Sequence, residues 1–118
     1  MTIKYHDFYV LFSAATKEQD RDRYIAEWSS SSIFYPGENG TDINADDLAD
    51  ALGNIWDVAH LTTRDIRQHL GLTQAAFAER FCIPRRTVEN WERKGGHIPP
   101  YNILAYAGIT GMLTVTRI

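Results

Sequence analysis

The pattern of apolar and polar positions predicts a chain built almost entirely of short helices. Apolar side chains recur at intervals of three and four residues, which is the spacing of one face of a helix. This spacing predicts helices over residues 5–15, 19–28, 45–59, 64–70, 73–81, 84–92 and 101–107. Residues 112–118 alternate instead, which is typical of a short strand, although a frayed terminus fits them equally well. The sequence therefore predicts an all-α fold with, at most, one short C-terminal strand.

Capping and turn residues locate the ends of several of these helices. Asn44 can cap the helix 45–59, and Thr62 or Thr63 can cap the helix 64–70. Gly71 is suited to end that helix, because glycine adopts the left-handed conformation without penalty. Residues 33–44 are rich in Pro, Gly and Asn, so we expect a loop there that serves as a linker.

Residues 72–93, with the sequence LTQAAFAERFCIPRRTVENWER, are predicted to form two short helices joined by a tight turn. Thr73 is a natural N-cap for the first helix. Pro84 cannot continue that helix, but its fixed φ suits the first position of the next one. Val88 and Trp91 lie three residues apart and are expected to face inward. The residues left facing outward on the second helix are Arg85, Arg86, Glu89, Asn90 and Arg93.

This outward-facing set contains the side chains that read DNA bases. The planar guanidinium group of Arg85 or Arg86 fits guanine O6 and N7, and the amide of Asn90 can pair in the same two-bonded way with adenine. A helix in the major groove presents its N-terminal residues to the base edges. A solvated arginine pair on an ordinary surface helix is the alternative interpretation, and the spacing around the pair favours DNA.

The same stretch resembles the helix-turn-helix of the phage-repressor (XRE/Cro/C1-type) DNA-binding proteins. The likeness covers about residues 61–108. It rests on Thr73-Gln74, Phe77-Ala78, Ile83, Thr87-Val88 and Trp91-Glu92. The resemblance implies an all-α, repressor-type bundle of five helices over residues 45–118, preceded by an acidic helical extension and loop over residues 1–44.

The resemblance also implies roles for individual residues. Arg85, Arg86 and Asn90 would read bases, and Glu89 is a fourth candidate. Gln74 would cap the first helix and touch a phosphate. We expect the phosphate contacts from Thr73, Gln74, Thr87, Arg93 and Lys94.

The sequence departs from the family pattern at two places. Cys82 stands where the turn usually has glycine, so a residue with a Cβ is expected in a left-handed conformation, at a cost of about 1–2 kcal/mol. The turn after the second helix, residues 94–97, is also longer than the family's usual turn.

The charge is distributed unevenly along the chain, whose net charge is −3. Residues 1–60 contain four basic and eleven acidic side chains, a net charge of −7. Residues 61–118 contain eight basic and four acidic side chains, a net charge of +4. Such an uneven distribution of charge can orient a protein on a polyanion. The alternative interpretation of the acidic first half is a solvated surface with no such role.

Other chemistry finds little support in the sequence. A single cysteine excludes an internal disulfide and fits a reducing cytoplasm, and no apolar run reaches the roughly 18 residues of a membrane span. Asp57 and His60 lie three residues apart, but no second pair follows at metal-ligand spacing. No nucleophile lies beside a base and an orienting acid, and no glycine-rich phosphate loop is present. We therefore expect no membrane contact, cofactor, metal or enzyme activity.

These observations predict a cytoplasmic transcriptional regulator, a repressor, that binds double-stranded DNA in a sequence-specific manner. One such helix reads only a few base pairs, so we expect a homodimer, joined through the N-terminal helices or the tail strand. The alternative hypothesis is an antitoxin-type interaction module whose acidic half binds a partner protein such as a toxin. A third is that the acidic half covers Arg85 and Arg86 until a signal releases them.

Overall fold

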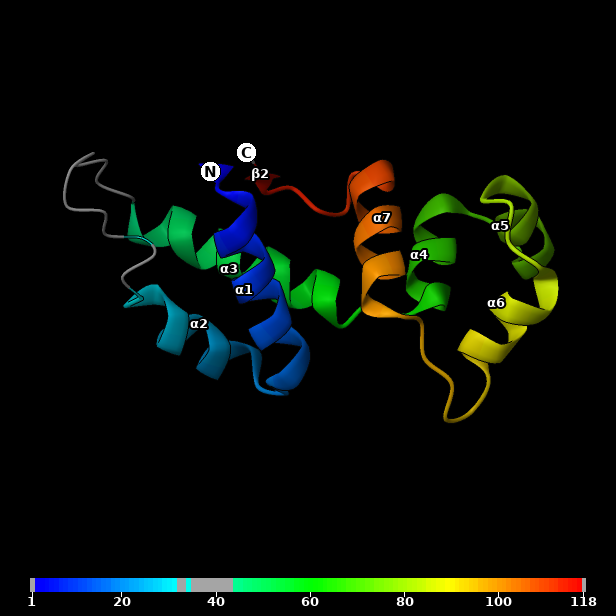
Figure 1. Ribbon diagram of the computed structural model, residues 1–118, viewed down its shortest axis with the longest axis horizontal. Helices are drawn as coiled ribbons and strands as arrows, with labels where there is room; N and C mark the ends of the chain where they lie inside the picture. Colours follow the sequence, from blue (N-terminus) through cyan, green and yellow to red (C-terminus); the bar gives the residue numbers. More distant parts are fainter. Residues whose placement is uncertain (1, 32–33, 35–43, 118) are drawn as a thin grey trace. The chain divides into compact units, whose positions relative to one another are not determined.

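The computed structural model describes residues 2–31, 34 and 44–117 of the 118-residue chain. These residues form seven α-helices and two very short strands (Figure 1). The helices are α1 (Tyr5–Lys17), α2 (Arg21–Ser29), α3 (Ala45–Ala59), α4 (Thr63–Leu70), α5 (Gln74–Arg80), α6 (Arg85–Glu92) and α7 (Pro100–Thr110), and the strands are β1 (Thr2–Ile3) and β2 (Thr116–Arg117). The predicted all-α fold is confirmed. The linker expected at residues 33–44 lies outside the described residues, apart from Phe34 and Asn44.

The chain divides into two compact units that differ from the predicted division. The first unit consists of residues 1–60 and 113–118, and the second unit consists of residues 61–112. The boundary was expected after residue 44, but α3 packs against α1 and α2 and therefore belongs to the first unit. The described part of the second unit consequently holds four helices, α4 to α7, and not the five that the resemblance implied.

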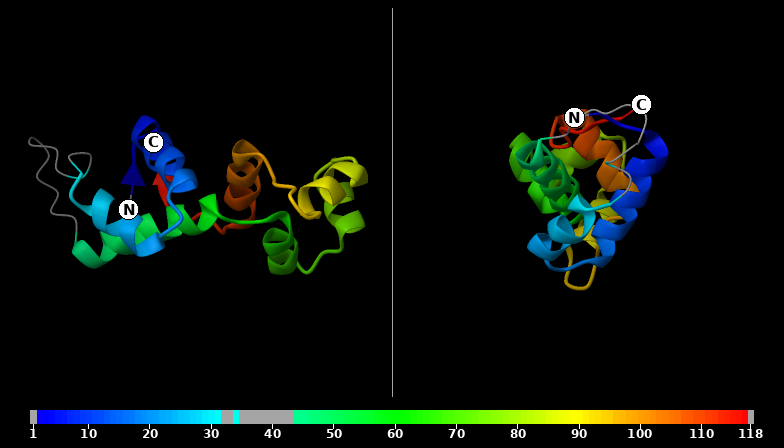
Figure 2. Two further views of the ribbon diagram at one scale, coloured as in Figure 1. Left: turned by 90° about the horizontal axis from the view of Figure 1, so that it is seen from below. Right: turned by 90° about the vertical axis from the view of Figure 1, so that its left-hand side faces the viewer.

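In the first unit, α3 lies against both α1 and α2 (Figure 2). The core between these helices contains Phe8 and Leu11 from α1, Tyr24 from α2, and Leu52 and Ile55 from α3, all fully buried. The hydroxyl of Tyr24 donates a hydrogen bond to the carbonyl oxygen of Leu11 at 2.7 Å, so its one polar atom is satisfied inside the core.

The C-terminal tail returns to this first unit. Strand β2 pairs with β1 in parallel, with Thr2 opposite Thr116. The backbone N–H of Thr114 donates to the Asn54 side chain at 2.9 Å, and Val115 is buried. The predicted C-terminal strand is thus confirmed. This strand pairs with a strand at the start of the same chain. The sequence pattern did not predict that first strand, because a strand of two residues is too short to show an alternating pattern.

The second unit has its own apolar core. Ile66, Phe77 and Val88 are fully buried, and Ile103 and Ala107 of α7 close the core from the C-terminal side. Aromatic rings extend this core through Phe77, Phe81, Tyr106 and Trp91. Val88 faces inward as expected, whereas Trp91 is only half-buried at the edge of the cluster. This packing fixes the orientation of α5 and α6 within the second unit. No helix in the described part of the chain has both the length and the apolar character needed to cross a membrane.

Candidate nucleic-acid interface

Helices α5 and α6 are joined by a turn of four residues, 81–84, in which Cys82 has the predicted left-handed conformation. The φ of Cys82 is +54°, the one positive value among the described residues other than glycine. The N–H of Ile83 donates to the carbonyl oxygen of Ala78 at 2.8 Å, which ties the turn back onto α5. Thr73 caps α5 as expected, because its hydroxyl accepts from the N–H of Ala76 at 3.1 Å. The two helices are therefore held in a tight, defined turn.

Helix α6 begins one residue later than predicted. Pro84 is its N-cap with φ −58° and ψ 134°, and the first helical residue is Arg85. The Pro84 carbonyl oxygen accepts from the N–H groups of Thr87 and Val88, at 2.9 and 3.4 Å. The proline thus still starts the helix, from the position just before it.

The exposed face of α6 brings together the predicted base-reading residues. Arg85, Arg86, Glu89 and Asn90 are all exposed, and their spacing places them on adjacent rows of one face. Arg85 Nε lies 3.1 Å from Glu89 Oε1, and these side chains remain 65% and 49% exposed. The side chains of Arg86 and Asn90 form no hydrogen bond or ion pair with any residue that the structure describes. Two guanidinium groups and one amide are therefore accessible from solvent.

The opposite side of α6 is anchored by a carboxylate that sequence reasoning did not single out. Glu92 is the last residue of α6, and its side chain is only 4% exposed. Both of its oxygens accept from Arg67 of α4, with Nη2 at 2.7 Å and Nε at 2.8 Å, and Arg64 Nε lies 3.7 Å away. The hydrogen bonds from Arg67 hold the pKa of Glu92 below its usual value, against the opposing effect of burial. We call this set, Arg64, Arg67, Gln74 and Glu92, the Glu92 cluster.

The Glu92 cluster also involves the start of α5. The side chain of Gln74, the first residue of α5, also helps to lower the pKa of Glu92. Arg67 Nη1 donates to the carbonyl oxygen of Leu72 at 3.0 Å, in the link between α4 and α5. Three helices are therefore joined through one carboxylate, and the Gln74 side chain is engaged there, while the capping role implied for Gln74 is filled by Thr73.

The residues expected at phosphates lie in different environments. Arg93 and Lys94 are exposed just after α6, without a side-chain partner among the described residues, whereas Thr87 is half-buried. The turn that carries Lys94 is constrained by Gly96, because a Cβ at that position would collide with the carbonyl oxygen of Asn90. The N–H of Gly96 donates to the carbonyl oxygen of Arg93 at 2.8 Å. This close approach explains why a glycine is present at position 96.

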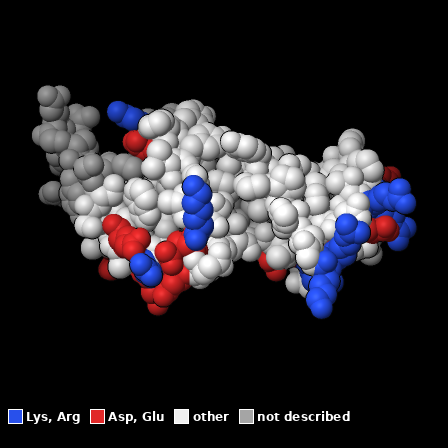
Figure 3. Space-filling view, turned by 60° about the horizontal axis from the view of Figure 1, so that its bottom comes forward, with Lys and Arg blue, Asp and Glu red and all other residues white. Residues whose placement is uncertain are grey.

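Charge gathers differently on the two units. In Figure 3, Lys and Arg side chains collect on the second unit at the end formed by α5 and α6, and Asp and Glu side chains collect on the first unit. The basic residues at this end of the second unit are all exposed: Arg80, Arg85, Arg86, Arg93 and Lys94. A polyanion would be attracted to this end of the second unit.

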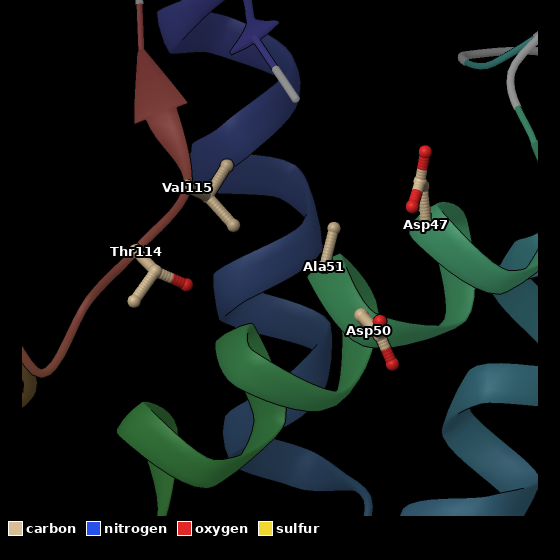
Figure 4. Close-up of a pocket in the computed structure, with 5 residues that line it drawn as sticks. All are labelled: Asp47, Asp50, Ala51, Thr114 and Val115. Carbon is tan, nitrogen blue, oxygen red and sulfur yellow. The ribbon is translucent and has the colours of Figure 1, made fainter.

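Among its described residues, the first unit shows no comparable group of exposed cationic and amide side chains. Asp57 is bound by Arg21 through two hydrogen bonds of 2.9 and 3.2 Å, and His60 Nε2 lies 2.7 Å from the carbonyl oxygen of Ala15. Among the described residues, no group of three His, Cys, Asp or Glu side chains could hold a metal ion. An open cavity of about 300 Å³ lies between α3 and the tail (Figure 4). The residues that line it are Asp47, Asp50, Ala51, Thr114 and Val115.

Comparison with known proteins identifies the second unit. Residues 64–116, a little under half of the chain, match the family model described as helix-turn-helix. This match begins within α4 and includes α5, α6 and α7. No curated protein and no solved structure matched the chain. Residues 64–116 therefore form a helix-turn-helix domain of the phage-repressor (XRE/Cro/C1) type, a type of domain that binds DNA in transcription regulators.

Proposed function

We propose that this protein represses transcription by binding a specific double-stranded DNA site with α6 in the major groove. The observation that carries the proposal is the exposed face of α6, where Arg85, Arg86 and Asn90 lie together with their polar groups in solvent. Guanidinium and amide groups are the side chains that pair most specifically with guanine and adenine. The Glu92 cluster supports the proposal, because it holds α6 from behind through a buried ion pair.

In this proposal, base contacts and phosphate contacts come from different residues. Arg85, Arg86 and Asn90 read base edges, and Glu89 contributes. Arg93 and Lys94 neutralise DNA phosphates next to the end of α6. Thr73, Gln74 and Thr87 contact the DNA backbone and help to set the register of the protein on the duplex. Gln74 would have to share its amide between Glu92 and a phosphate oxygen, since its N–H₂ group carries two donors.

We further propose that the protein acts as a homodimer on an inverted repeat. One α6 spans only a few base pairs, and two copies would read half-sites about one helical turn of DNA apart. The exposed Tyr5, Tyr9 and Val10 on α1 supply apolar surface of the kind that protein contacts bury. A DNA-binding role would place the protein wherever the cell keeps its DNA.

The test is a binding series on a duplex site selected by the wild-type protein. Arg85→Ala and Arg86→Ala should each weaken binding to that site by about 1–3 kcal/mol and relax its sequence preference. Lys94→Ala should instead weaken all duplexes about equally and reduce the dependence on salt. Lys17→Ala on α1 is the matched control, because it removes the same charge from the first unit. Wild-type affinity in both arginine variants would refute the proposed role of α6.

The second candidate function is an antitoxin-type module whose acidic first unit binds a partner protein. The exposed apolar residues of α1 and the net charge of −7 over residues 1–60 favour it, because they suit a basic partner with an apolar patch. Co-expression with the product of the neighbouring gene would test it. A complex that survives purification and is lost in Tyr9→Lys, with DNA binding intact, would support this function; separate elution of the two proteins would refute it.

A further inference from the structure

The ion pair between Arg85 and Glu89 lies on the DNA-facing side of α6 proposed above. Arg85 Nε and Glu89 Oε1 are 3.1 Å apart, one helical turn from each other. Both side chains are largely exposed, so the pair is accessible to a ligand. The contact joins two residues that could each meet a base edge.

The position of this pair is poor for stabilising the helix alone. Arg85 and Arg86 occupy the first turn of α6, which has no acidic residue, and the helix dipole disfavours cations at that end. An i,i+4 pair also stabilises a helix more when the acidic residue comes first in sequence, and here the arginine comes first. Because the exposed Arg23–Glu27 pair of α2 has the same order of charges, what distinguishes the pair on α6 is its place beside the exposed Arg86 and Asn90.

The contact leaves one defined edge of the arginine available. The Arg85 guanidinium approaches Glu89 through Nε, and the terminal nitrogens Nη1 and Nη2 form no hydrogen bond with a described residue; together these two nitrogens match guanine O6 and N7. Holding the guanidinium plane in one orientation before binding reduces the side-chain freedom that must be lost on DNA. Glu89 therefore positions Arg85 for guanine.

Glu89 also has a second carboxylate oxygen, Oε2, besides the Oε1 that lies 3.1 Å from Arg85 Nε. An ionised carboxylate can only accept hydrogen bonds, so it favours a base that offers a donor. Cytosine presents its N4 amino group in the major groove, adenine presents its N6 amino group beside the acceptor N7, and guanine and thymine present acceptors that a carboxylate repels, so cytosine is the best match. A cytosine opposite the guanine itself would add no information, so the informative cytosine is one in the adjacent base pair, which two side chains that meet at 3.1 Å can reach together.

We propose that Arg85 and Glu89 act as one unit that recognises a guanine together with a cytosine of the neighbouring base pair. This inference rests on the proposed function, because it assumes that α6 enters the major groove. It adds a base composition for the centre of each half-site and gives Glu89 two roles: it orients Arg85 and it accepts from cytosine.

The experiment is selection of binding sites from a random duplex pool with the full-length protein and two single-residue variants. Wild type should enrich sites with the guanine and cytosine at fixed positions. Glu89→Gln should weaken the guanine preference about fivefold or more and change the cytosine position to adenine, since glutamine pairs with adenine N6 and N7. Glu79→Gln is the matched control: Glu79 is exposed on α5, and its loss removes the same charge without touching α6. It should raise affinity for all duplexes and leave the selected sequence unchanged.

The possible results separate the inference from the function on which it rests. If Glu89→Gln selects the wild-type sequence, or if wild type selects sites without the guanine–cytosine combination, the inference is overturned while the proposed function stands. If wild type binds no duplex better than random DNA, both fail. Glu89→Asp keeps the charge but is one methylene shorter, so it should lose the cytosine preference as well; retention of that preference would also overturn the inference.

Discussion

Replacing Arg67 with methionine should destabilise the second unit more than any change on the exposed face of α6. Methionine keeps the length and packing of the aliphatic chain but removes the guanidinium group. Three hydrogen bonds would be lost: two to the Glu92 carboxylate at 2.7 and 2.8 Å and one to the Leu72 carbonyl oxygen at 3.0 Å. Glu92, with its side chain only 4% exposed, would be left as a buried anion without its main partner.

The expected loss follows from what remains around the carboxylate. Removing one partner of a buried ion pair typically costs about 3–5 kcal/mol, because the remaining charge is uncompensated. Here the cost is reduced, since Arg64 Nε lies 3.7 Å from Glu92 and the Arg67 side chain is itself 15% exposed. We expect a loss of about 2–4 kcal/mol for Arg67→Met. The double variant Arg67→Met/Glu92→Leu should recover most of it, because no buried charge remains.

The assay is urea unfolding of the full-length protein labelled with fluorotryptophan and followed by fluorine NMR. Trp91 reports on the second unit, and Trp28 and Trp56 report on the first unit, so the two units are followed separately in one sample. With an m-value of about 1.5 kcal/mol/M, the predicted loss lowers the midpoint of the Trp91 signal by roughly 1.3–2.7 M. A shift below about 0.5 M, or a double variant as unstable as the sum of both single variants, would refute the proposed contribution of the ion pair.

The remaining predictions concern pH and the turns on either side of α6, and the Trp91 signal measures each of them. The hydrogen bonds from Arg67 lower the pKa of Glu92 from 4.5. Near pH 4 the unfolded chain therefore binds more protons at this carboxyl group than the folded protein does. The stability due to the carboxylate is present above about pH 4.5 and is lost as the pH falls through the lowered pKa. Glu92→Gln should therefore show a flatter decline in stability with acid than wild type, and an equal decline would contradict this. Cys82→Gly should stabilise the second unit by about 0.5–1 kcal/mol. Glycine removes the steric cost of φ +54°, and this gain exceeds the additional backbone entropy that glycine loses on folding. A lower midpoint in this variant would exclude strain at the turn. Gly96→Ala should destabilise it by about 1–3 kcal/mol, because the new methyl group would collide with the Asn90 carbonyl oxygen; an unchanged midpoint would show that the turn can move.

Local sequence signals predicted the helices well, because each depends on residues close together in the chain. The apolar spacing predicted all seven helices to within a few residues. The caps at Asn44 and Thr73 were confirmed by side-chain hydrogen bonds of 2.7 and 3.1 Å, and Thr62 proved to be the cap of α4. The left-handed Cys82 followed from its place in a turn where the family has glycine.

Features that depend on distant residues were not predicted. Glu92 was one of the residues on which the family resemblance rests, but nothing in the sequence indicates that this charged residue faces inward. The partner of Glu92, Arg67, lies 25 residues away. The apolar stripe of α3 was recognised, yet a stripe does not say which helices will cover it, so α3 was assigned to the wrong side of the boundary. Only the packing of α3 on α1 and α2 settles its place.

The second unit uses its carboxylates in a way that leaves the cations of α6 available. Asp65 caps the start of α4 by accepting from the N–H of Thr62, and Glu92 is buried against Arg67. Only Glu79 and Glu89 therefore present an exposed carboxylate that is not needed to hold the fold, and Glu89 is already committed to Arg85. Stability and DNA contact should consequently depend on separate residues. A variant of Arg67 or Glu92 should lose DNA binding only to the extent that the second unit unfolds, whereas a variant of the exposed face should lose DNA binding with the fold intact.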